Sequence, residues 1–462
     1  MTTVQATTVE PFRASLRGRL IVEGDAEYEG ARKVYNSMID KRPALIARCL
    51  DVADVSAAVR FAREQHLPLA IRGGGHNGGG LGTCDGGLVI DLSAMRGVRV
   101  DPKARATRVA GGCVWADVDH ATHAYGLAIP TGIISTTGVG GLTLGGGVGN
   151  LSRKCGLTID NLLEVDMVLA DGSAVTASAD EHPDLFWAVR GGGGNFGVVT
   201  SFLFRSHPIH TNYAGPMMWP LERAREIMQW YREFLPGAPD ELGGWFGFVT
   251  CPPAAPFPEP AQGQKMALIF WCYTGSLEKG EDIFRPIRTM FGPPAVDFVG
   301  PIPHPAMQGM FDALYPPGLQ WYWRGDYVKE LPDAAIDKHI EYASRLPTPL
   351  STMHLYPIDG AAGRVDSSDT PWSYRDAHWA GVFAGVDPDP ANATKIRDWT
   401  VSYQQALHPY SMGGSYINFM MEEGQERIKA TYRGNYDRLA RVKAQYDPDN
   451  VFRINQNIRP RA

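Results

Sequence analysis

The sequence predicts an α+β protein of two domains, and three observations support that prediction. The chain has 462 residues, which is more than one hydrophobic core usually organises. Most of its 52 glycines fall in the first 200 residues, in stretches bounded by apolar runs. Beyond residue 208 glycine becomes rarer, and nine of the eleven tryptophans lie between residues 208 and 412. We therefore expect one domain over residues 1–207 and a second, of mixed helix and sheet, over residues 208–412.

The first elements expected along the chain form a βαβ unit over residues 43–76. Two apolar runs are separated by a stretch with apolar residues at helical spacing, and Asp51 is the expected N-cap of that helix. The unit ends in the sequence RGGGHNGGG, residues 72–80, in which His76 stands between two runs of three glycines. Residues 86–112 then show short alternating runs with turn residues, which predict antiparallel strands.

Further elements are expected later in the chain. Residues 126–162 form a second glycine-rich region, and residues 185–204 predict a helix end, a glycine turn and a strand. Residues 319–328 alternate in polarity, which places Trp321 and Trp323 on one strand face. Near the C-terminus, an amphipathic helix is expected to end at Asp447-Pro448, before an extended run over residues 450–458.

Composition excludes several classes of function. The net charge is −6 and no block of lysine and arginine occurs, so neither nucleic acid nor a membrane surface is an expected partner. No stretch approaches the roughly 18 apolar residues of a membrane-spanning helix. The six cysteines are scattered without paired spacing, which argues against a disulfide framework and against a zinc site. We expect a cytoplasmic protein without a bound metal.

Two isolated features leave alternatives open. His120 and His123 are spaced to share a helix face, where they could bind zinc or, more commonly, face solvent. Cys155 follows Arg153 and Lys154, which could lower the pKa of its thiol, although a small buried cysteine is the commoner case.

The glycine motifs do not indicate a nicotinamide cofactor. Gly192, Gly194 and Gly197 match GxGxxG, but a dinucleotide-binding turn follows a strand and precedes a helix, and here that order is reversed. Backbone N–H groups in a glycine-rich turn can instead bind phosphate oxygens without a lysine. Loops at residues 73–75 and 138–141 would suit a pyrophosphate, although each alone could be an ordinary tight turn. Together with His76 they favour a nucleotide cofactor.

Four motifs carry a family resemblance: residues 72–93, 130–162, 185–200 and 446–458. They resemble the FAD-linked oxidoreductases related to berberine bridge enzyme, and the resemblance extends from about residue 40 to the C-terminus. It implies the vanillyl-alcohol oxidase fold, with a PCMH-type FAD-binding domain of two α+β subdomains. It also implies a substrate domain with an antiparallel sheet backed by helices, and a return of residues 413–462 to the FAD-binding domain.

The resemblance also implies how FAD is held. In the family, the histidine of the first glycine loop is bonded to the 8α carbon of the flavin, so His76 is the expected covalent anchor. Such a bond withdraws electron density and raises the redox potential. The other residues implied to hold FAD are Arg72, Gly73, Gly74, Gly75 and Asn77 at the pyrophosphate; Pro130, Thr131, Gly132, Ser135, Thr136, Thr137, Gly138, Gly140 and Gly141 along the ribityl chain and ring; Gly146, Gly149 and Asn150 beyond them; Val198 at the adenine; and Asn418 at the flavin ring.

The chain departs from part of the family. Members whose flavin is bonded twice carry cysteine where this chain has Ile134, and typically histidine where it has Leu142, so a single linkage through His76 is implied. Thr137 occupies the position that tunes access of dioxygen to the flavin. Threonine is nearly isosteric with the valine associated with oxidases, whereas leucine accompanies dehydrogenases, so an oxidase is favoured.

Residues on the substrate side are less closely specified. Residues 413–420 resemble a family segment that makes Tyr416 the active-site tyrosine, either as a general base or as an orienting hydrogen-bond donor, since a phenol has an unperturbed pKa of about 10. Arg364 stands where berberine bridge enzyme has a glutamate base. Trp321 and Trp323 either line the substrate cavity or pack in the core. Tyr356, Tyr374 and His354 are further cavity candidates.

The function predicted is that of an FAD-dependent oxidase. Hydride from an alcohol or saccharide hydroxyl carbon would move to flavin N5 while Tyr416 assists loss of the hydroxyl proton, and dioxygen would reoxidise the flavin to give hydrogen peroxide. A ring-bearing amine or a natural-product intermediate is the second substrate class. A dehydrogenase with another acceptor, and a non-catalytic flavin-binding protein, remain alternatives.

Overall fold

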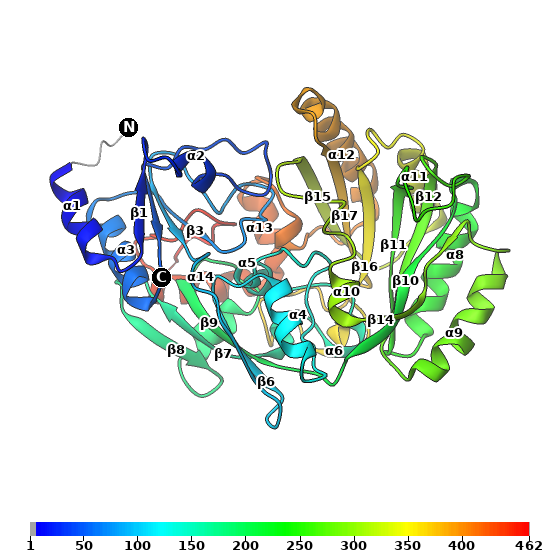
Figure 1. The fold of residues 1–462 in the computed structure, drawn as a ribbon, viewed down its shortest axis with the longest axis horizontal. Helices are drawn as coiled ribbons and strands as arrows, with labels where there is room; N and C mark the ends of the chain where they lie inside the picture. The colour runs from blue at the N-terminus through cyan, green and yellow to red at the C-terminus, as the bar shows by residue number, and fades with distance from the viewer. Residues whose placement is uncertain (1–5, 462) are drawn as a thin grey trace.

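The computed structural model describes residues 6–461, and its strands form three β-sheets (Figure 1). The first two sheets come from the glycine-rich part of the chain. The third comes from the tryptophan-rich part. No helix within residues 6–461 has both the length and the apolar character needed to cross a membrane.

The first sheet has four strands in the order β1-β2-β4-β3. The predicted βαβ unit is confirmed as β2, α3 and β3, and the Asp51 carboxylate caps α3 by accepting the N–H of Asp54. Helices α1 and α2 flank this sheet in sequence. The bounds of these elements are α1 Ala6–Ser15, β1 Arg19–Val22, α2 Tyr28–Ala31, β2 Leu45–Arg48, α3 Val52–Glu64, β3 Leu69–Arg72 and β4 Leu88–Asp91.

The prediction of antiparallel strands over residues 86–112 is wrong for β4. This strand lies between β2 and β3 and is parallel to both. All four of its residues are buried, as expected for a central strand of a parallel sheet. The prediction is confirmed for β5 Val98–Asp101 and β6 Ala106–Ala110, which pair antiparallel.

The second sheet has five antiparallel strands in the order β5-β6-β9-β7-β8. The predicted helix end, glycine turn and strand over residues 185–204 are confirmed as the end of α7, a turn and β9. The remaining elements of this part are α4 Trp115–His123, α5 Val139–Gly145, α6 Ser152–Cys155, β7 Leu162–Val168, β8 Ala174–Ser178, α7 Pro183–Val189 and β9 Val198–Arg205.

The third sheet is antiparallel, and its eight strands fall within residues 211–387. Its order is β13-β10-β12-β11-β16-β17-β15, with β14 paired to β10. The strands are β10 Thr211–Pro220, β11 Leu242–Thr250, β12 Lys265–Tyr273, β13 Val296–Asp297, β14 Gly300–Pro303, β15 Gln320–Val328, β16 Thr352–Pro357 and β17 Trp379–Asp387; the helices of this part are α8 Ala224–Phe234, α9 Leu277–Met290, α10 His304–Gln308, α11 Asp333–Ala343 and α12 Ala393–Leu407.

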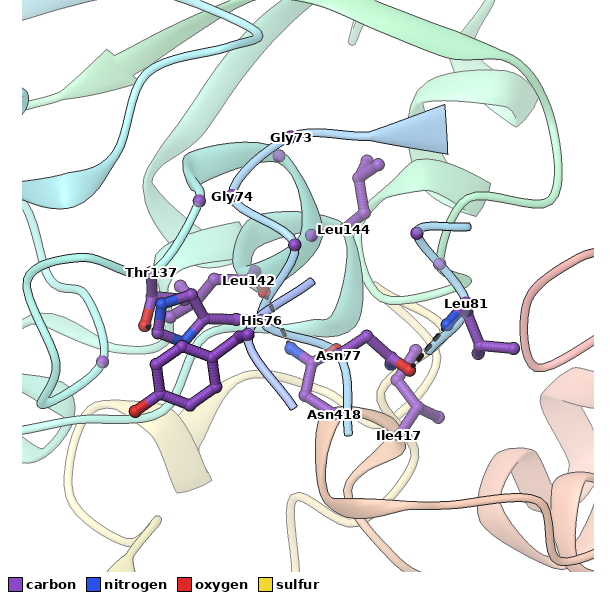
Figure 2. A pocket seen from close by; sticks show the side chains of 18 of the residues that line it. Gly73, Gly74, His76, Asn77, Leu81, Thr137, Leu142, Leu144, Ile417 and Asn418 are labelled. Carbon is purple, nitrogen blue, oxygen red and sulfur yellow. Dashed lines mark hydrogen bonds between the residues drawn. The ribbon is translucent and has the colours of Figure 1, made fainter. Parts of the chain in front are cut away.

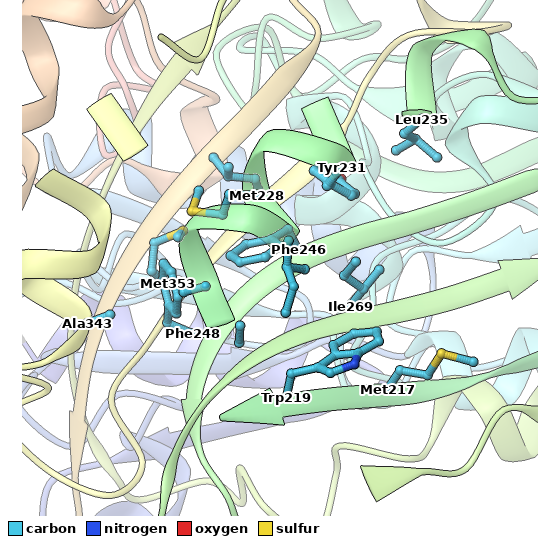
Figure 3. Close-up of a cluster of buried hydrophobic side chains, with 14 of the residues drawn as sticks. Met217, Trp219, Met228, Tyr231, Leu235, Phe246, Phe248, Ile269, Ala343 and Met353 are labelled. Carbon is cyan, nitrogen blue, oxygen red and sulfur yellow. The ribbon is translucent and has the colours of Figure 1, made fainter. Parts of the chain in front are cut away.

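Both faces of the third sheet are buried. Consecutive side chains of a strand point to opposite faces, and on β11 two neighbouring residues belong to two different cores. Phe246 packs with Met228 and Tyr231 of α8 in the core under the helices, which Figure 3 shows. The preceding residue, Trp245, belongs to a different core that also contains Tyr416 from the C-terminal segment. Figure 1 shows α8, α9 and α11 on the outer side of the sheet, so its other face is turned toward the first part of the chain.

The C-terminal segment packs back on the first part of the chain. Its helices, α13 Gln425–Tyr432 and α14 Tyr436–Tyr446, contribute to the core that contains Phe202 of β9. The predicted end of α14 at Asp447 is confirmed. The extended run expected after it forms no strand; it is held instead by side chains, as when Asn195 accepts the N–H of Ile458.

Candidate active site

A cavity of about 350 Å³ is lined by the glycine loops, by strands of the third sheet and by the C-terminal segment. Its volume lies in the range of sites for small molecules. Figure 2 shows the loop with Gly73, Gly74 and His76 close to Thr137, and Asn418 close to Leu142. Residues distant in sequence therefore meet at one site, and each part of the chain contributes to it.

Glycine is required where the two loops cross. A Cβ on Gly74 would lie 2.4 Å from the backbone nitrogen of Gly138, and a Cβ on Gly138 would lie 2.2 Å from that of Gly74. Real Cβ atoms do not approach other atoms this closely, so the loops are in backbone contact. Gly78 meets a different partner, because a Cβ there would lie 2.4 Å from the indole ring of Trp323.

The first loop presents a row of free backbone donors. Within the described part of the chain, the N–H groups of residues 73–78 have no hydrogen-bond acceptor. All of these residues except Gly78 are partly exposed at the cavity, so their N–H groups are available to an acceptor that binds there. Successive N–H groups of this kind form a concave site for an anion such as a pyrophosphate.

The Arg72 side chain is held by partners within the protein. Its guanidinium is buried and donates to the Asp91 carboxylate at 2.8 Å and to the backbone carbonyl oxygen of Ala31. The side chain joins β3 to the neighbouring strand β4, and contact between Arg72, which lines the cavity, and the pyrophosphate stays a prediction. The role of this side chain is to fix the start of the loop.

His76 faces the cavity and is held on both sides. Its Nε2 lies 3.0 Å from the Thr136 hydroxyl, its Nδ1 lies 3.5 Å from that of Thr137, and its ring stacks on Tyr35 with centroids 3.8 Å apart. Burial lowers the pKa of His76 to about 4, because charging the imidazole would cost solvation. His76 is therefore neutral at physiological pH, and one ring nitrogen keeps its lone pair.

The second glycine region divides into residues that line the cavity and residues that support them. The predicted residues that line it are Gly132, Thr137, Gly138, Gly140 and Gly141, together with Gly73, Gly74, Gly75, His76 and Asn77 of the first loop. The predicted residues outside the lining are Pro130, Thr131, Ser135, Thr136, Gly146, Gly149, Asn150 and Val198.

The supporting residues have contacts that explain their position. Ser135 donates its N–H to Asp312 at 3.0 Å and its hydroxyl to the same carboxylate. Asn150 donates to Gln308 at 3.0 Å and accepts from the Trp245 indole at 3.2 Å. These bonds join the second glycine region to the third sheet and α10, while direct cofactor contact by these side chains stays a prediction.

Three further predicted residues serve packing. A Cβ on Gly149 would lie 1.8 Å from the carbonyl oxygen of Thr131, and one on Gly146 would lie 2.4 Å from the Trp372 ring. The Val198 side chain is fully buried in a core beneath the first sheet, although both neighbouring residues line the cavity.

Tyr416 lies at the cavity with its phenol oxygen already engaged. The Gly147 N–H donates to that oxygen at 2.9 Å, and the Asn418 amide donates to it at 2.7 Å. Both lone pairs are therefore occupied, while its hydroxyl hydrogen has no acceptor within residues 6–461. Burial raises the pKa of Tyr416 to about 12. This geometry favours the orienting donor over the general base.

The predicted substrate residues are brought together with one exception. Trp321, Trp323 and His354 line the cavity, whereas Tyr374 does not. Tyr374 stacks on Tyr327 and donates its hydroxyl to the carbonyl oxygen of Ala430 at 2.8 Å, which turns it toward the C-terminal segment. Its assignment to the substrate site is corrected.

Sequence analysis missed Tyr35 and the pair Gln308 and Asp312. Tyr35 supports the ring of His76, and Gln308 donates to the carbonyl oxygen of Gly132 at 2.8 Å. All three belong to segments without a recognisable motif. Their roles depend on tertiary contacts, so no signal in the sequence could have identified them.

Other candidates lie away from the cavity. Arg364 pairs with Asp240 at the surface, and Asp359 pairs with Arg153. Cys155 is half-buried, and desolvation raises the pKa of its thiol to about 12, which favours an unreactive thiol; its lack of reactivity stays a prediction. His120 and His123 are not part of a metal site, since the described residues contain no group of three or more His, Cys, Asp or Glu side chains that could hold a metal ion.

The residues present fit FAD. The unpaired N–H groups of residues 73–78 suit its pyrophosphate, the uncharged glycine-lined wall suits its ring system, and the neutral imidazole of His76 suits attachment to carbon. Apart from Arg72, no lysine, arginine, aspartate or glutamate lines the cavity among the described residues. Backbone donors, and not charged side chains, are therefore what this site offers to phosphates.

Comparisons with known proteins agree with this geometry. Residues 43–178 match the FAD binding domain family, and residues 415–459 match the family described as berberine and berberine like. An FAD-linked oxidoreductase of Dictyostelium discoideum is 32% identical over 457 residues, which cover 98% of this chain and 97% of that protein.

Solved structures share the fold over nearly the full length. The structure of 6-hydroxy-D-nicotine oxidase from Arthrobacter nicotinovorans has a TM-score of 0.86 at 26% identity, covering 97% of this chain and 99% of that one. Chitooligosaccharide oxidase has a TM-score of 0.83 at 23% identity, covering 98% and 100%, a likeness that shows the fold alone. With its full-length relative and its glycine-lined cavity, the chain belongs to the berberine bridge enzyme-like family of FAD-linked oxidoreductases.

Proposed function

We propose that this FAD-dependent oxidoreductase is an oxidase whose flavin is bonded through His76, and that it oxidises an alcohol at the cavity. The observation that carries the proposal is the neutral imidazole of His76 at the cavity wall, directly within the run of unpaired N–H groups of residues 73–78. Those donors would hold the pyrophosphate, and His76 would meet the edge of the flavin ring.

A single linkage is supported by two other residues of the lining. Ile134 and Leu142, whose side chains cannot bond to a flavin, both line the cavity. None of the six cysteines lines it, and Cys155 is protonated at physiological pH. His76 is therefore the one attachment point that we assign.

FAD, when bound, supplies a hydride acceptor that later passes its electrons to dioxygen. The chain's own residues then have three tasks. Tyr416 would donate its hydroxyl hydrogen to the substrate oxygen and so orient it, since both lone pairs of Tyr416 are occupied; as the alcohol carbon gives up its hydride, the substrate's hydroxyl proton would leave to solvent. Trp321 and Trp323 exclude water from the substrate side. Thr137, beside His76, sets access for dioxygen.

The names of some structural relatives support oxidase chemistry, although two others with the same fold are described as glucose dehydrogenases. Two relatives are described as oxidases, one acting on 6-hydroxy-D-nicotine and the other on a chitooligosaccharide. These names support an acceptor role for dioxygen here, but they differ in substrate. The substrate class must therefore be argued from this chain's own cavity.

Reoxidation of the flavin tests the oxidase assignment without a known substrate. The holoenzyme is photoreduced under anaerobic conditions and mixed with air-saturated buffer, and the return of flavin absorbance is followed while peroxide is measured. An oxidase reoxidises within seconds and yields one hydrogen peroxide per flavin. Reoxidation over many minutes would instead identify a dehydrogenase that uses another acceptor.

A further inference from the structure

Three alternate residues of β16 form one wall of the cavity. Thr352, His354 and Tyr356 share a strand face, and all three line the cavity. The His354 Nε2 lies 2.8 Å from the Thr352 hydroxyl, and its Nδ1 lies 2.6 Å from the Tyr356 hydroxyl. The Thr352 hydroxyl also lies 2.9 Å from the backbone carbonyl oxygen of Phe248. The four groups form one continuous chain of hydrogen bonds.

The direction of this chain follows from its last member. A carbonyl oxygen only accepts, so the single hydroxyl hydrogen of Thr352 is donated to Phe248. Thr352 must then accept from the Nε2–H of His354. A neutral imidazole carries one hydrogen, so its Nδ1 accepts from the Tyr356 hydroxyl. The direction of all three hydrogen bonds is therefore fixed. If they ran the other way, the Thr352 oxygen would turn a lone pair toward the Phe248 carbonyl oxygen, and the two oxygens would repel each other.

His354 stays neutral, which keeps this direction. It is buried against Trp245, with ring centroids 4.3 Å apart, and burial lowers its pKa to about 3. Tyr356 is also buried, and burial raises its pKa well above the ordinary value. The Tyr356 hydroxyl donates its hydrogen bond to His354, and its oxygen accepts no hydrogen bond from the described residues. It can therefore offer only a lone pair to a ligand.

The remainder of the substrate wall is apolar and uncharged. The other side chains of the third sheet that line the cavity are aromatic or aliphatic, namely Trp321, Trp323, Val382 and Ala384, and the one permanent charge in the lining, on Arg72, is paired with Asp91. The aromatic members beside β16 are Tyr35, Tyr315, Trp321, Trp323 and Phe419. A protonated amine would find no carboxylate here, and the several hydroxyls of an oligosaccharide would find few partners. Unpaired polar groups of either kind would lose their hydration without replacement.

We propose that the substrate is a neutral, largely aromatic alcohol, and that Tyr356, fixed by the chain through His354 and Thr352, accepts a hydrogen bond from a hydroxyl of that substrate. This inference rests on the proposed oxidase function and narrows its substrate class. Tyr356 then determines specificity by contact with the substrate, whereas Thr352 is a positioning residue that acts through His354. Tyr416 and Tyr356 have complementary roles, one as donor and one as acceptor.

The test uses ligands that differ in one hydrogen-bond donor. The probes are 2-naphthol, 2-methoxynaphthalene and naphthalene, which are planar and have no carbinol hydrogen to lose. Binding to the holoenzyme is measured by calorimetry and by the change in flavin absorbance. We expect 2-naphthol to bind about tenfold more tightly than either probe that lacks the donor, because a buried acceptor left unpaired is costly.

Matched variants test whether the preference for 2-naphthol depends on the hydrogen bonds that link Tyr356, His354 and Thr352. Tyr356→Phe should remove it, bringing the three dissociation constants within about twofold, and Thr352→Val should reduce it by releasing His354. Tyr374→Phe, which removes a buried hydroxyl outside the cavity, should keep it. Equal binding of 2-naphthol and 2-methoxynaphthalene to the wild type would overturn the proposal. So would a preference that survives Tyr356→Phe, or tighter binding of chitobiose or of protonated 2-naphthylmethylamine than of 2-naphthol.

The test separates this inference from the oxidase assignment. Slow reoxidation of the reduced flavin together with a Tyr356-dependent preference for 2-naphthol would reject the oxidase and support the binding role. Rapid reoxidation without any preference would support the oxidase and reject the role of Tyr356.

Discussion

Gly74→Ala tests whether the two glycine loops are in backbone contact at the cavity. The added Cβ would lie 2.4 Å from the nitrogen and 2.6 Å from the Cα of Gly138. Ordinary contact needs about 3.4 Å or more, so one loop must move by about 1 Å. Neither neighbour is a flexible side chain that could move aside. Overpacking of this kind costs about 1–3 kcal/mol, which corresponds to roughly 5-fold to 150-fold weaker noncovalent binding of FAD before the bond to His76 forms, so that less flavin is incorporated.

The assay measures the ratio of flavin to protein in the purified variant, with circular dichroism as a check of folding. The matched control is Gly97→Ala, because a Cβ there meets nothing within 4 Å. Gly74→Ala should fold but carry much less FAD, and Gly97→Ala should carry the wild-type amount. Full flavin content in Gly74→Ala would refute the backbone contact and the site built on it.

The remaining predictions concern groups around the site. Lys443→Met should lower the free energy of unfolding, measured in urea, by about 3–5 kcal/mol, because the fully buried ammonium of Lys443 makes three hydrogen bonds. The control Lys429→Met removes an exposed ion pair and should cost under about 1 kcal/mol. Equal losses of stability in the two variants would contradict the role of the buried lysine. The raised pKa of Cys155 keeps its thiol protonated at pH 8, so iodoacetamide should label it slowly in the native protein and rapidly after unfolding, and rapid native labelling would be inconsistent with burial. Asp312→Ala removes both acceptors of Ser135 and should cost about 1–3 kcal/mol of stability and lower the flavin content, and an unchanged melting midpoint would speak against this clamp.

Local signals predicted the elements that carry the cofactor. The βαβ unit and the end of α14 follow from capping and from periodicity over a few residues, and both are confirmed. The first glycine loop follows from composition, since runs of glycine let the backbone approach an acceptor closely. His76 could be singled out for the same reason, because a linker gains nothing from an imidazole at its centre.

The pairing of strands and the direction of individual side chains depend on tertiary contacts, so they could not be predicted from the sequence. The parallel pairing of β4 depends on β2 and β3, which come from elsewhere in the chain. Tyr356 and Tyr374 had equal standing as candidates, but only strand alternation on β16 turns Tyr356 into the cavity. The Arg72 side chain likewise could not be assigned, because its partner Asp91 lies on the neighbouring strand.

Acid precipitation of the holoenzyme tests the central claim most directly. The wild-type pellet should stay yellow, and the pellet of His76→Ala should be colourless with free FAD in the supernatant, while Cys155→Ser should behave as wild type. Mass spectrometry of the flavin-bearing peptide should then identify residues around His76. Flavin released from the wild type, or retained by His76→Ala, would contradict a single histidyl linkage.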